Sequence, residues 1–114
     1  CRYPNKLADD LWAREDVFST GLGFGFAIPH TKSEHIEQSA ISVCRLAKPI
    51  MWGDEEAQFI IMLTLNKHAA GDQHMKIFSK LARKIMHADF REQLMSATDT
   101  LQVEALLKQG LELA

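Results

Sequence analysis

The stretch QFIIMLTL (residues 58–65) decides the fold of this 114-residue chain. It is a nearly unbroken apolar run of strand length, and such runs are typical of a central strand that is covered on both faces. The segment AISVCRL (40–46) alternates in the way a strand does. Pro49 and Gly53 mark turns between the two segments. We therefore expect at least two strands in the core.

Helical patterns lie on both sides of these strands. Before them, KLADDLWARED predicts a helix that Asn5 caps and that ends near Asp16. The face of this helix that we expect to pack carries Leu7, Leu11 and Trp12. After the strands, a second helix is expected over residues 73–86, with Asp72 as its N-cap. Its buried stripe consists of Met75, Phe78, Leu81, Ala82 and Ile85.

Two further helices complete the pattern. A short helix is expected around DFREQLMSA (89–97). A last helix, TLQVEALLKQG, is expected to be capped by Thr98 and to stop at Gly110. Because helices and strands interleave along the chain, the fold class is α/β.

Composition excludes several classes of function. The chain is 46% hydrophobic and 25% charged with a formal net charge of −2, which is ordinary for one soluble domain. Its 13 basic residues are scattered, so we expect no nucleic-acid partner. No stretch approaches the ~20 apolar residues of a membrane span, so we expect no direct membrane insertion. The positions of Cys1 and Cys44 do not indicate a disulfide framework, so we expect a cytoplasmic location. Cys44 is interpreted as a small buried hydrophobic residue.

The segment TGLGFGFAIPH (20–30) places glycines at alternate positions before Pro29 and His30. Their spacing does not match the G-x-G-x-x-G pattern of dinucleotide binding. Two interpretations stay open. In the first, the glycines form a turn and FAIPH is an edge strand that ends at proline. In the second, exposed backbone amides approach an anion, above all a phosphoryl group, while Pro29 fixes the path of the chain into His30.

Arg14 and His74 are the side chains that could complete an anion site. Arg14 stands at the end of the first helix and could bind phosphate oxygens with its guanidinium fork, although an isolated arginine is more often solvated. His74 falls in the first turn of the second helix, where the positive helix end disfavours imidazolium. The alternative for His74 is a partly buried histidine with a local hydrogen bond.

A metal centre is not expected from the histidines. His68 and His74 are six residues apart, which does not suit pairing on one helix face, and no Cys-x-x-Cys is present. We interpret His35 and His87 as surface residues and His68 as a loop residue. No metal and no cofactor are therefore expected.

Taken in order, Arg14, STGLGFGFAIPH, WGD and GDQHMKIFSKLARKI resemble the fructose/mannitol-type EIIA domains of the bacterial phosphoenolpyruvate-dependent sugar phosphotransferase system. The resemblance runs from about Asp9 to Leu107, and MWGDEEA is closer to the fructose-type members. It implies an α/β sandwich with a mixed sheet flanked by helices. It also implies that residues 1–114 form one domain that lacks the leading strand and helix of the family, as a piece of a longer polypeptide would.

The resemblance also assigns a site. His30 matches the phosphorylated histidine, and Arg14 and His74 match its catalytic partners. The expected contacts to the phosphoryl group come from Thr20, Gly23 and Gly25, with the glycines letting the chain pass close beneath it.

The implied role is that of a phosphotransferase with a phosphohistidine intermediate. It would take the phosphoryl group from the carrier HPr, either as a separate protein or as part of the same polypeptide, and pass it to a cysteine of a fructose-type EIIB domain. The alternative is a regulatory module whose phosphorylation state controls binding to other proteins. An apolar patch around His30, with Phe24 and Phe26 as its aromatic candidates, is the expected docking surface.

Overall fold

The computed structural model describes residues 4–17, 19–34, 39–66 and 73–111. The chain divides into two compact units, Cys1–Ala69 and Ala70–Ala114. The first unit holds a β-sheet with one helix, and the second unit is helical.

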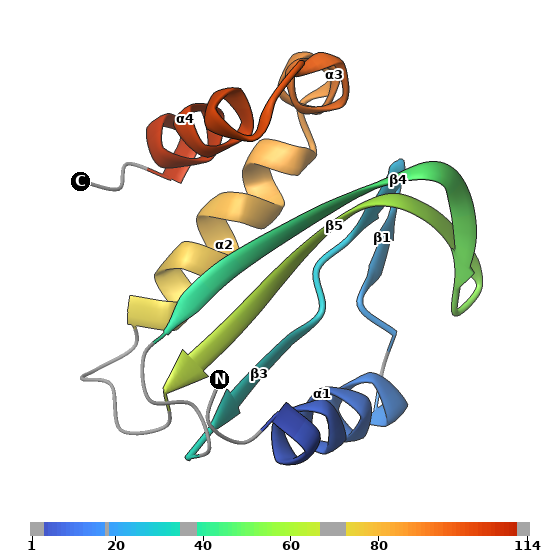
Figure 1. Ribbon diagram of the computed structural model, residues 1–114, viewed down its shortest axis with the longest axis vertical. Coiled ribbons are helices and arrows are strands. Elements are labelled where there is room, and N and C mark those ends of the chain that lie inside the picture. The colour runs from blue at the N-terminus through green and yellow to red at the C-terminus, as the bar shows by residue number, and fades with distance from the viewer. Residues whose placement is uncertain (1–3, 18, 35–38, 67–72, 112–114) are drawn as a thin grey trace. The chain divides into compact units, whose positions relative to one another are not determined.

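Strand β5 (Glu55–Asn66) is the centre of the sheet (Figure 1). Strand β4 (Ala40–Trp52) pairs with it antiparallel along one edge. Strands β2 (Gly25–Ala27) and β3 (His30–Ser33) both pair with β5 in parallel, so they follow one another along its other edge. Strand β1 (Gly21–Gly23) pairs antiparallel with β2. Among the described residues this gives a mixed open sheet of five strands, and the expected α/β class is confirmed.

One face of β5 is buried completely. Ala57, Phe59, Ile61 and Leu63 have no exposed surface, and the ring centroid of Phe59 lies 5.1 Å from that of Phe26. Residues on the other face, such as Ile60 and Met62, are only half-buried. The predicted central strand is therefore correct, but its second face is less covered than the apolar run indicated.

Strand β4 is longer than the predicted segment 40–46 and continues to Trp52. Its pairing with β5 is irregular between Arg45 and Ile50, which is where Pro49 lies. Proline has no backbone N–H for the ladder, so it suits such an irregularity. The expectation that Cys44 is buried was wrong. Cys44 is exposed, because most side chains of β4 on both faces remain open to solvent.

Helix α1 (Pro4–Val17) contacts β3 in the sheet unit. It begins at Pro4, whose fixed φ and missing N–H suit a first helical position, so Asn5 lies in the first turn and is not the cap. None of the described residues of α1 is buried, and the Trp12 side chain is 68% exposed. The predicted packing face was therefore wrong for Trp12, whereas Leu7 and Leu11 are half-buried.

The glycine-rich segment forms the hairpin of β1 and β2. Gly23, Phe24 and Gly25 have φ angles of 80°, 58° and 82°, a left-handed conformation that glycine adopts without penalty. Phe24 at the tip is 57% exposed, whereas Phe26 is 1% exposed. The turn of the first interpretation is observed, but the expected edge strand was wrong, because β2 pairs with β1 on one side and with β5 on the other.

The helical unit contains α2 (Gln73–Ile85), α3 (Ala88–Ser96) and α4 (Thr100–Leu111), which contact one another. The predicted stripe of α2 is observed in Leu81 and Ile85, which are fully buried. The side chain of Met75 and all of Asp72 lie outside the described residues. The core of this unit also contains Phe90, Leu94, Leu107 and Leu111.

The ends of α4 differ from the prediction. The backbone N–H of Gln102 donates to Asp99 Oδ1 at 2.8 Å, so Asp99 caps the helix and Thr98 does not. Thr98 instead donates its N–H and its hydroxyl to Gln102 Oε1. Gly110 lies inside the helix, where a Cβ atom would come within 3.0 Å of the Phe90 ring. Across the described ranges, no helix combines the length and apolar character that crossing a membrane requires.

Candidate active site around His30

His30 is the first residue of β3 and pairs with Leu63 of β5. The residue before it, Pro29, has no N–H and occupies the break between β2 and β3, while its carbonyl accepts a hydrogen bond from Leu63 N at 2.9 Å. The imidazole is half-buried at this edge of β5. The backbone of His30 is therefore held by the buried central strand, while its ring stays accessible.

Two hydrogen bonds define the protonation of the His30 ring. Nδ1 lies 2.9 Å from the carbonyl oxygen of Ile28, and a carbonyl can only accept, so Nδ1 carries the proton. Arg14 Nε donates to Nε2 at 3.2 Å, so Nε2 is the acceptor. Both contacts select the same neutral tautomer, in which Nε2 keeps the lone pair that accepts the hydrogen bond from Arg14.

The structure brings Arg14 to His30 because α1 lies against β3 (Figure 1). Arg14 stands in the last turn of the helix and is half-buried. Its guanidinium donates to the ring nitrogen on which a transferred group would be carried. The pair therefore combines an imidazole lone pair with a positive charge beside it.

Thr20 has a different place from the expected one. Its hydroxyl donates to the Glu15 carboxylate and accepts from Trp52 Nε1 at 3.1 Å, and its N–H donates to Glu15 Oε2 at 2.8 Å. Trp52 Nε1 also donates to Glu15 Oε1 at 2.7 Å. Thr20 is 6% exposed, and both of its donors, the N–H and the hydroxyl, are occupied by the Glu15 carboxylate. Sequence reasoning missed Glu15, and its only local signal was its position next to Arg14.

The structure does not bring Gly23 and Gly25 to His30. Gly25 pairs with Ala57 and His30 pairs with Leu63, six residues further along β5. At about 3.3 Å per residue, the separation along the strand is about 20 Å. In Figure 1 the connection from β1 to β2 lies at the end of the sheet away from α1. The glycine amides therefore serve the hairpin at the opposite end of the strand.

The same register corrects the expected docking patch. Phe26 packs in the core against Phe59. Phe24 is exposed, but it lies at the hairpin tip next to Gly25 and shares that distance from His30. Neither phenylalanine forms an apolar surface around His30.

Helix α2 includes His74 in its first turn, as predicted, but the side chain of His74 lies outside the described residues. His68 and His35 also lie outside them. The role of His74 therefore stays a prediction. His87, interpreted as a surface residue, is exposed.

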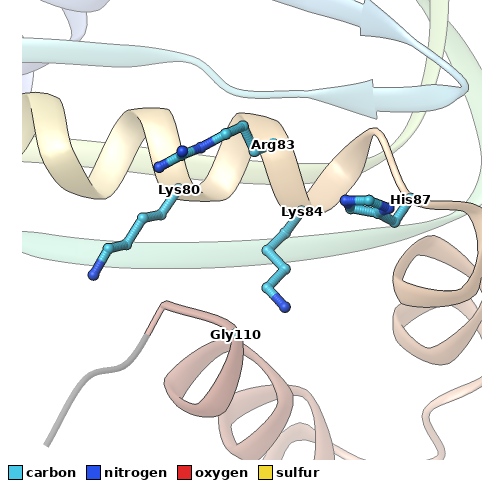
Figure 2. Close-up of a pocket in the computed structure, with 5 residues that line it drawn as sticks. All are labelled: Lys80, Arg83, Lys84, His87 and Gly110. Carbon is cyan, nitrogen blue, oxygen red and sulfur yellow. The ribbon is translucent and has the colours of Figure 1, made fainter.

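A basic groove in the helical unit is another feature, among the described residues, that could attract an anion. It is an open space of about 470 Å³ lined by Lys80, Arg83, Lys84, His87 and Gly110 (Figure 2). Arg83 Nε donates to the Ser79 carbonyl at 3.4 Å. The side chains of Lys80 and Lys84 extend away from the Arg83 side chain. The cationic groups diverge and do not converge on one point, so this groove lacks the geometry of a phosphoryl site.

The mixed sheet and the Arg14–His30 pair define the chain as an α/β domain with a half-buried histidine that is hydrogen-bonded to an arginine at the edge of β5. The chain belongs to the family described as phosphoenolpyruvate-dependent sugar phosphotransferase system, EIIA 2, which it matches over residues 2–110. The resemblance seen in the sequence is thereby confirmed.

Two relatives from Escherichia coli K12 illustrate the family. Multiphosphoryl transfer protein 2 is 71% identical over 99% of this chain, which spans only 14% of that relative. The fructose-like EIIA component of the phosphotransferase system is 39% identical, and the alignment covers 94% of this chain and 73% of the relative.

Solved structures show the same fold. The nitrogen regulatory protein IIA-Ntr of Neisseria meningitidis is 33% identical with a TM-score of 0.80, over 87% of this chain and 69% of that one. The complex of enzyme IIA-mannitol with phosphorylated enzyme IIB-mannitol from Escherichia coli matches with a TM-score of 0.71 over 91% of this chain and 74% of that one. The second match is 18% identical and supports the fold alone.

Proposed function

We propose that this domain accepts a phosphoryl group from phospho-HPr on Nε2 of His30 and passes it to the cysteine of a fructose-type EIIB domain. The observation that carries the proposal is the state of the imidazole. Ile28 holds the proton on Nδ1, and Nε2 keeps its lone pair beside a guanidinium. This is the arrangement that a nitrogen nucleophile needs for phosphoryl transfer near neutral pH.

Two steps take place at Nε2: the N–P bond forms when His30 accepts the phosphoryl group, and it breaks when His30 donates it. The guanidinium of Arg14 releases the Nε2 lone pair as it moves onto the phosphoryl oxygens. The lone pair then forms a bond to phosphorus while the bond between phosphorus and the donor breaks and the donor keeps its electron pair. The phosphorylated ring still bears the Nδ1 proton, and the hydrogen bond to the Ile28 carbonyl stabilises the resulting positive charge. A cysteine thiolate then attacks phosphorus, and the N–P bond breaks with its electron pair returning to Nε2. The charged ring is a good leaving group for this step.

Arg14 provides the electrostatic part of the mechanism. The transition state of phosphoryl transfer is loose, and negative charge spreads over three equatorial oxygens, so catalysis consists mainly of positioning and charge stabilisation. A guanidinium that already lies 3.2 Å from the nucleophilic nitrogen needs only a small shift to reach those oxygens. We propose His74 as a further N–H donor, on the strength of its match to the family pattern.

The relatives support transport over other roles. The 39% identical relative is a fructose-like EIIA component, and the 71% identical relative is a multiphosphoryl transfer protein of which this chain spans 14%. Both fit a domain that passes phosphoryl groups on, and the second fits a donor carried by the same polypeptide. The fold is also that of an enzyme IIA that forms a complex with a phosphorylated enzyme IIB.

The alternative function is regulatory. It is favoured by the structural likeness to a nitrogen regulatory protein at 33% identity. In that case the phosphorylated domain would control binding to other proteins and would not donate its phosphoryl group to EIIB.

The test is a two-step phosphotransfer assay. With phosphoenolpyruvate, enzyme I and HPr, the protein is expected to gain an acid-labile, base-stable phosphate, which His30→Ala abolishes. His87→Ala is the matched control, since His87 is exposed and lies in the helical unit. Undiminished labelling of His30→Ala would refute the assignment. If the labelled protein passes phosphate to no EIIB cysteine, the regulatory function becomes the better conclusion.

A further inference from the structure

The position of helix α1 on the sheet determines where the Arg14 side chain lies. None of its described residues is fully buried and Leu7 and Leu11 are only half-buried, so apolar packing alone holds it weakly on the sheet. Arg14 stands in its last turn, where helices fray most readily. Yet the Arg14 Nε lies within 3.2 Å of the His30 ring. Something other than a hydrophobic stripe must hold the end of α1 in place.

Glu15 supplies that hold. Its carboxylate accepts hydrogen bonds from three donors, namely the Thr20 N–H, the Thr20 hydroxyl and the Trp52 indole N–H. Thr20 is where the chain enters β1, and Trp52 is where β4 ends. We call Glu15, Thr20 and Trp52 the carboxylate clasp. A glutamate in the last turn opposes the helix dipole, so its presence there calls for a compensating role, and the three donors provide one.

The clasp is connected to both nitrogens of the His30 ring. The Ile28 N–H donates to the Thr20 carbonyl at 3.0 Å, and the Ile28 carbonyl accepts from His30 Nδ1 at 2.9 Å. On the other side, Glu15 is bonded in sequence to Arg14, whose Nε donates to Nε2. The contacts therefore form a closed ring that runs from Nδ1 through Ile28, Thr20, Glu15 and Arg14 to Nε2.

We propose that Glu15 is a positioning residue for phosphoryl transfer, which holds the Arg14 guanidinium at Nε2 of His30 through the carboxylate clasp. This inference rests on the proposed function. None of the contacts described for Glu15 joins it to His30, so it acts through Arg14. Phosphoryl transfer depends on near-attack geometry, and a misplacement of about 1 Å can slow such a step about 100-fold.

The first measurement concerns the resting protein. In ¹⁵N NMR of the His30 ring, Arg14→Lys removes the donor at Nε2 and moves that resonance. Glu15→Gln is expected to move the Nε2 resonance in the same direction, because an amide has one acceptor oxygen and cannot receive all three donors. The variant Trp52→Phe removes the indole N–H donor of the clasp. Its matched control is Trp12→Phe, since Trp12 is exposed on α1 and lies outside the clasp. An Nε2 resonance that stays at the wild-type position in Glu15→Gln overturns the proposal.

The second measurement is the single-turnover rate of phosphorylation. Glu15→Gln, Thr20→Val and Trp52→Phe are each expected to slow it by about 10- to 100-fold. Thr20→Ser, which keeps the hydroxyl, and Trp12→Phe are expected to stay near the wild-type rate. Thermal denaturation of each variant verifies folding. If Glu15→Gln does not fold, Thr20→Val against Thr20→Ser carries the same comparison, and equal rates for that pair overturn the proposal.

A double-mutant cycle separates positioning from general destabilisation. If Glu15 acts through Arg14, adding Glu15→Gln to Arg14→Lys slows transfer by less than about threefold further, whereas independent effects multiply. Full multiplication overturns the proposal. Absence of any phosphate on wild-type His30 would instead refute the proposed function, and the NMR result would still decide the placement of Arg14.

Discussion

Replacing Arg14 with lysine tests the centre of the proposed mechanism. Lysine keeps the positive charge but loses both the Nε–H that reaches Nε2 at 3.2 Å and the two-pronged guanidinium. A hydrogen bond that involves a charged group contributes about 1.5–3 kcal/mol. If the transition state loses that amount, the rate falls by about 10- to 150-fold, at 1.36 kcal/mol per factor of ten. Because lysine keeps its charge, we expect the lower part of this range, about 10- to 30-fold.

The stability of the Arg14→Lys variant should change little. Arg14 is half-buried in the last turn of a helix that has no buried residue among those described. We therefore expect a loss of less than about 1 kcal/mol, which corresponds to a fall in Tm of no more than about 4–8 °C.

The assay is rapid-quench phosphorylation of the protein by phospho-HPr, with a thermal melt of the same sample. Arg83→Lys is the matched control, since Arg83 is an exposed arginine in the helical unit. Transfer at the wild-type rate in Arg14→Lys would refute the electrostatic role of Arg14. A large fall in Tm with a proportionate fall in active protein would show that the residue is structural.

Three further predictions follow from the site and the sheet. His74→Gln should slow transfer about tenfold in the same assay with an unchanged Tm, and an unchanged rate would remove His74 from the mechanism. Gly53→Ala should lower the free energy of unfolding by at least about 1 kcal/mol in a denaturant titration, because φ is 66° and a Cβ atom would lie 2.6 Å from Ser19 Oγ; equal midpoints would contradict this. Phe24→Asn should leave the transfer rate unchanged, since Phe24 lies at the far end of the sheet from His30, and slower transfer would mean that this hairpin takes part in docking.

The local pattern of the sequence determined most of the secondary structure. Residues 58–65 became the centre of β5, and the helices after it appeared within a few residues of their predicted ends. The order of Arg14, the glycine segment with His30, WGD and GDQHMKIFSKLARKI indicated the family. These signals are carried by the period of apolar residues and by residues with unusual backbone geometry, and both are properties of neighbours in the chain.

Capping was less predictable because neighbouring residues compete for the same role. Asn5 and Thr98 are both acceptable N-caps by residue type, yet the helices begin at Pro4 and behind Asp99. Cys44 was expected to be buried because it stands in an apolar run. Its exposure depends on which faces of β4 the rest of the protein covers, and a run of residue types contains no information on that.

The site shows which features the sequence indicates and which depend on the tertiary structure. The resemblance to the family singled out Arg14 and His30 as candidates, but only the contact of α1 with β3 brings Nε to Nε2. The glycines, equally prominent in the sequence, are placed by strand register about 20 Å along β5 from His30. The clasp that Glu15 makes with Trp52 joins residues 37 apart in sequence. Which segments pair, and which distant side chains then meet, depends on the assembly of the whole sheet, so a local pattern does not determine these contacts.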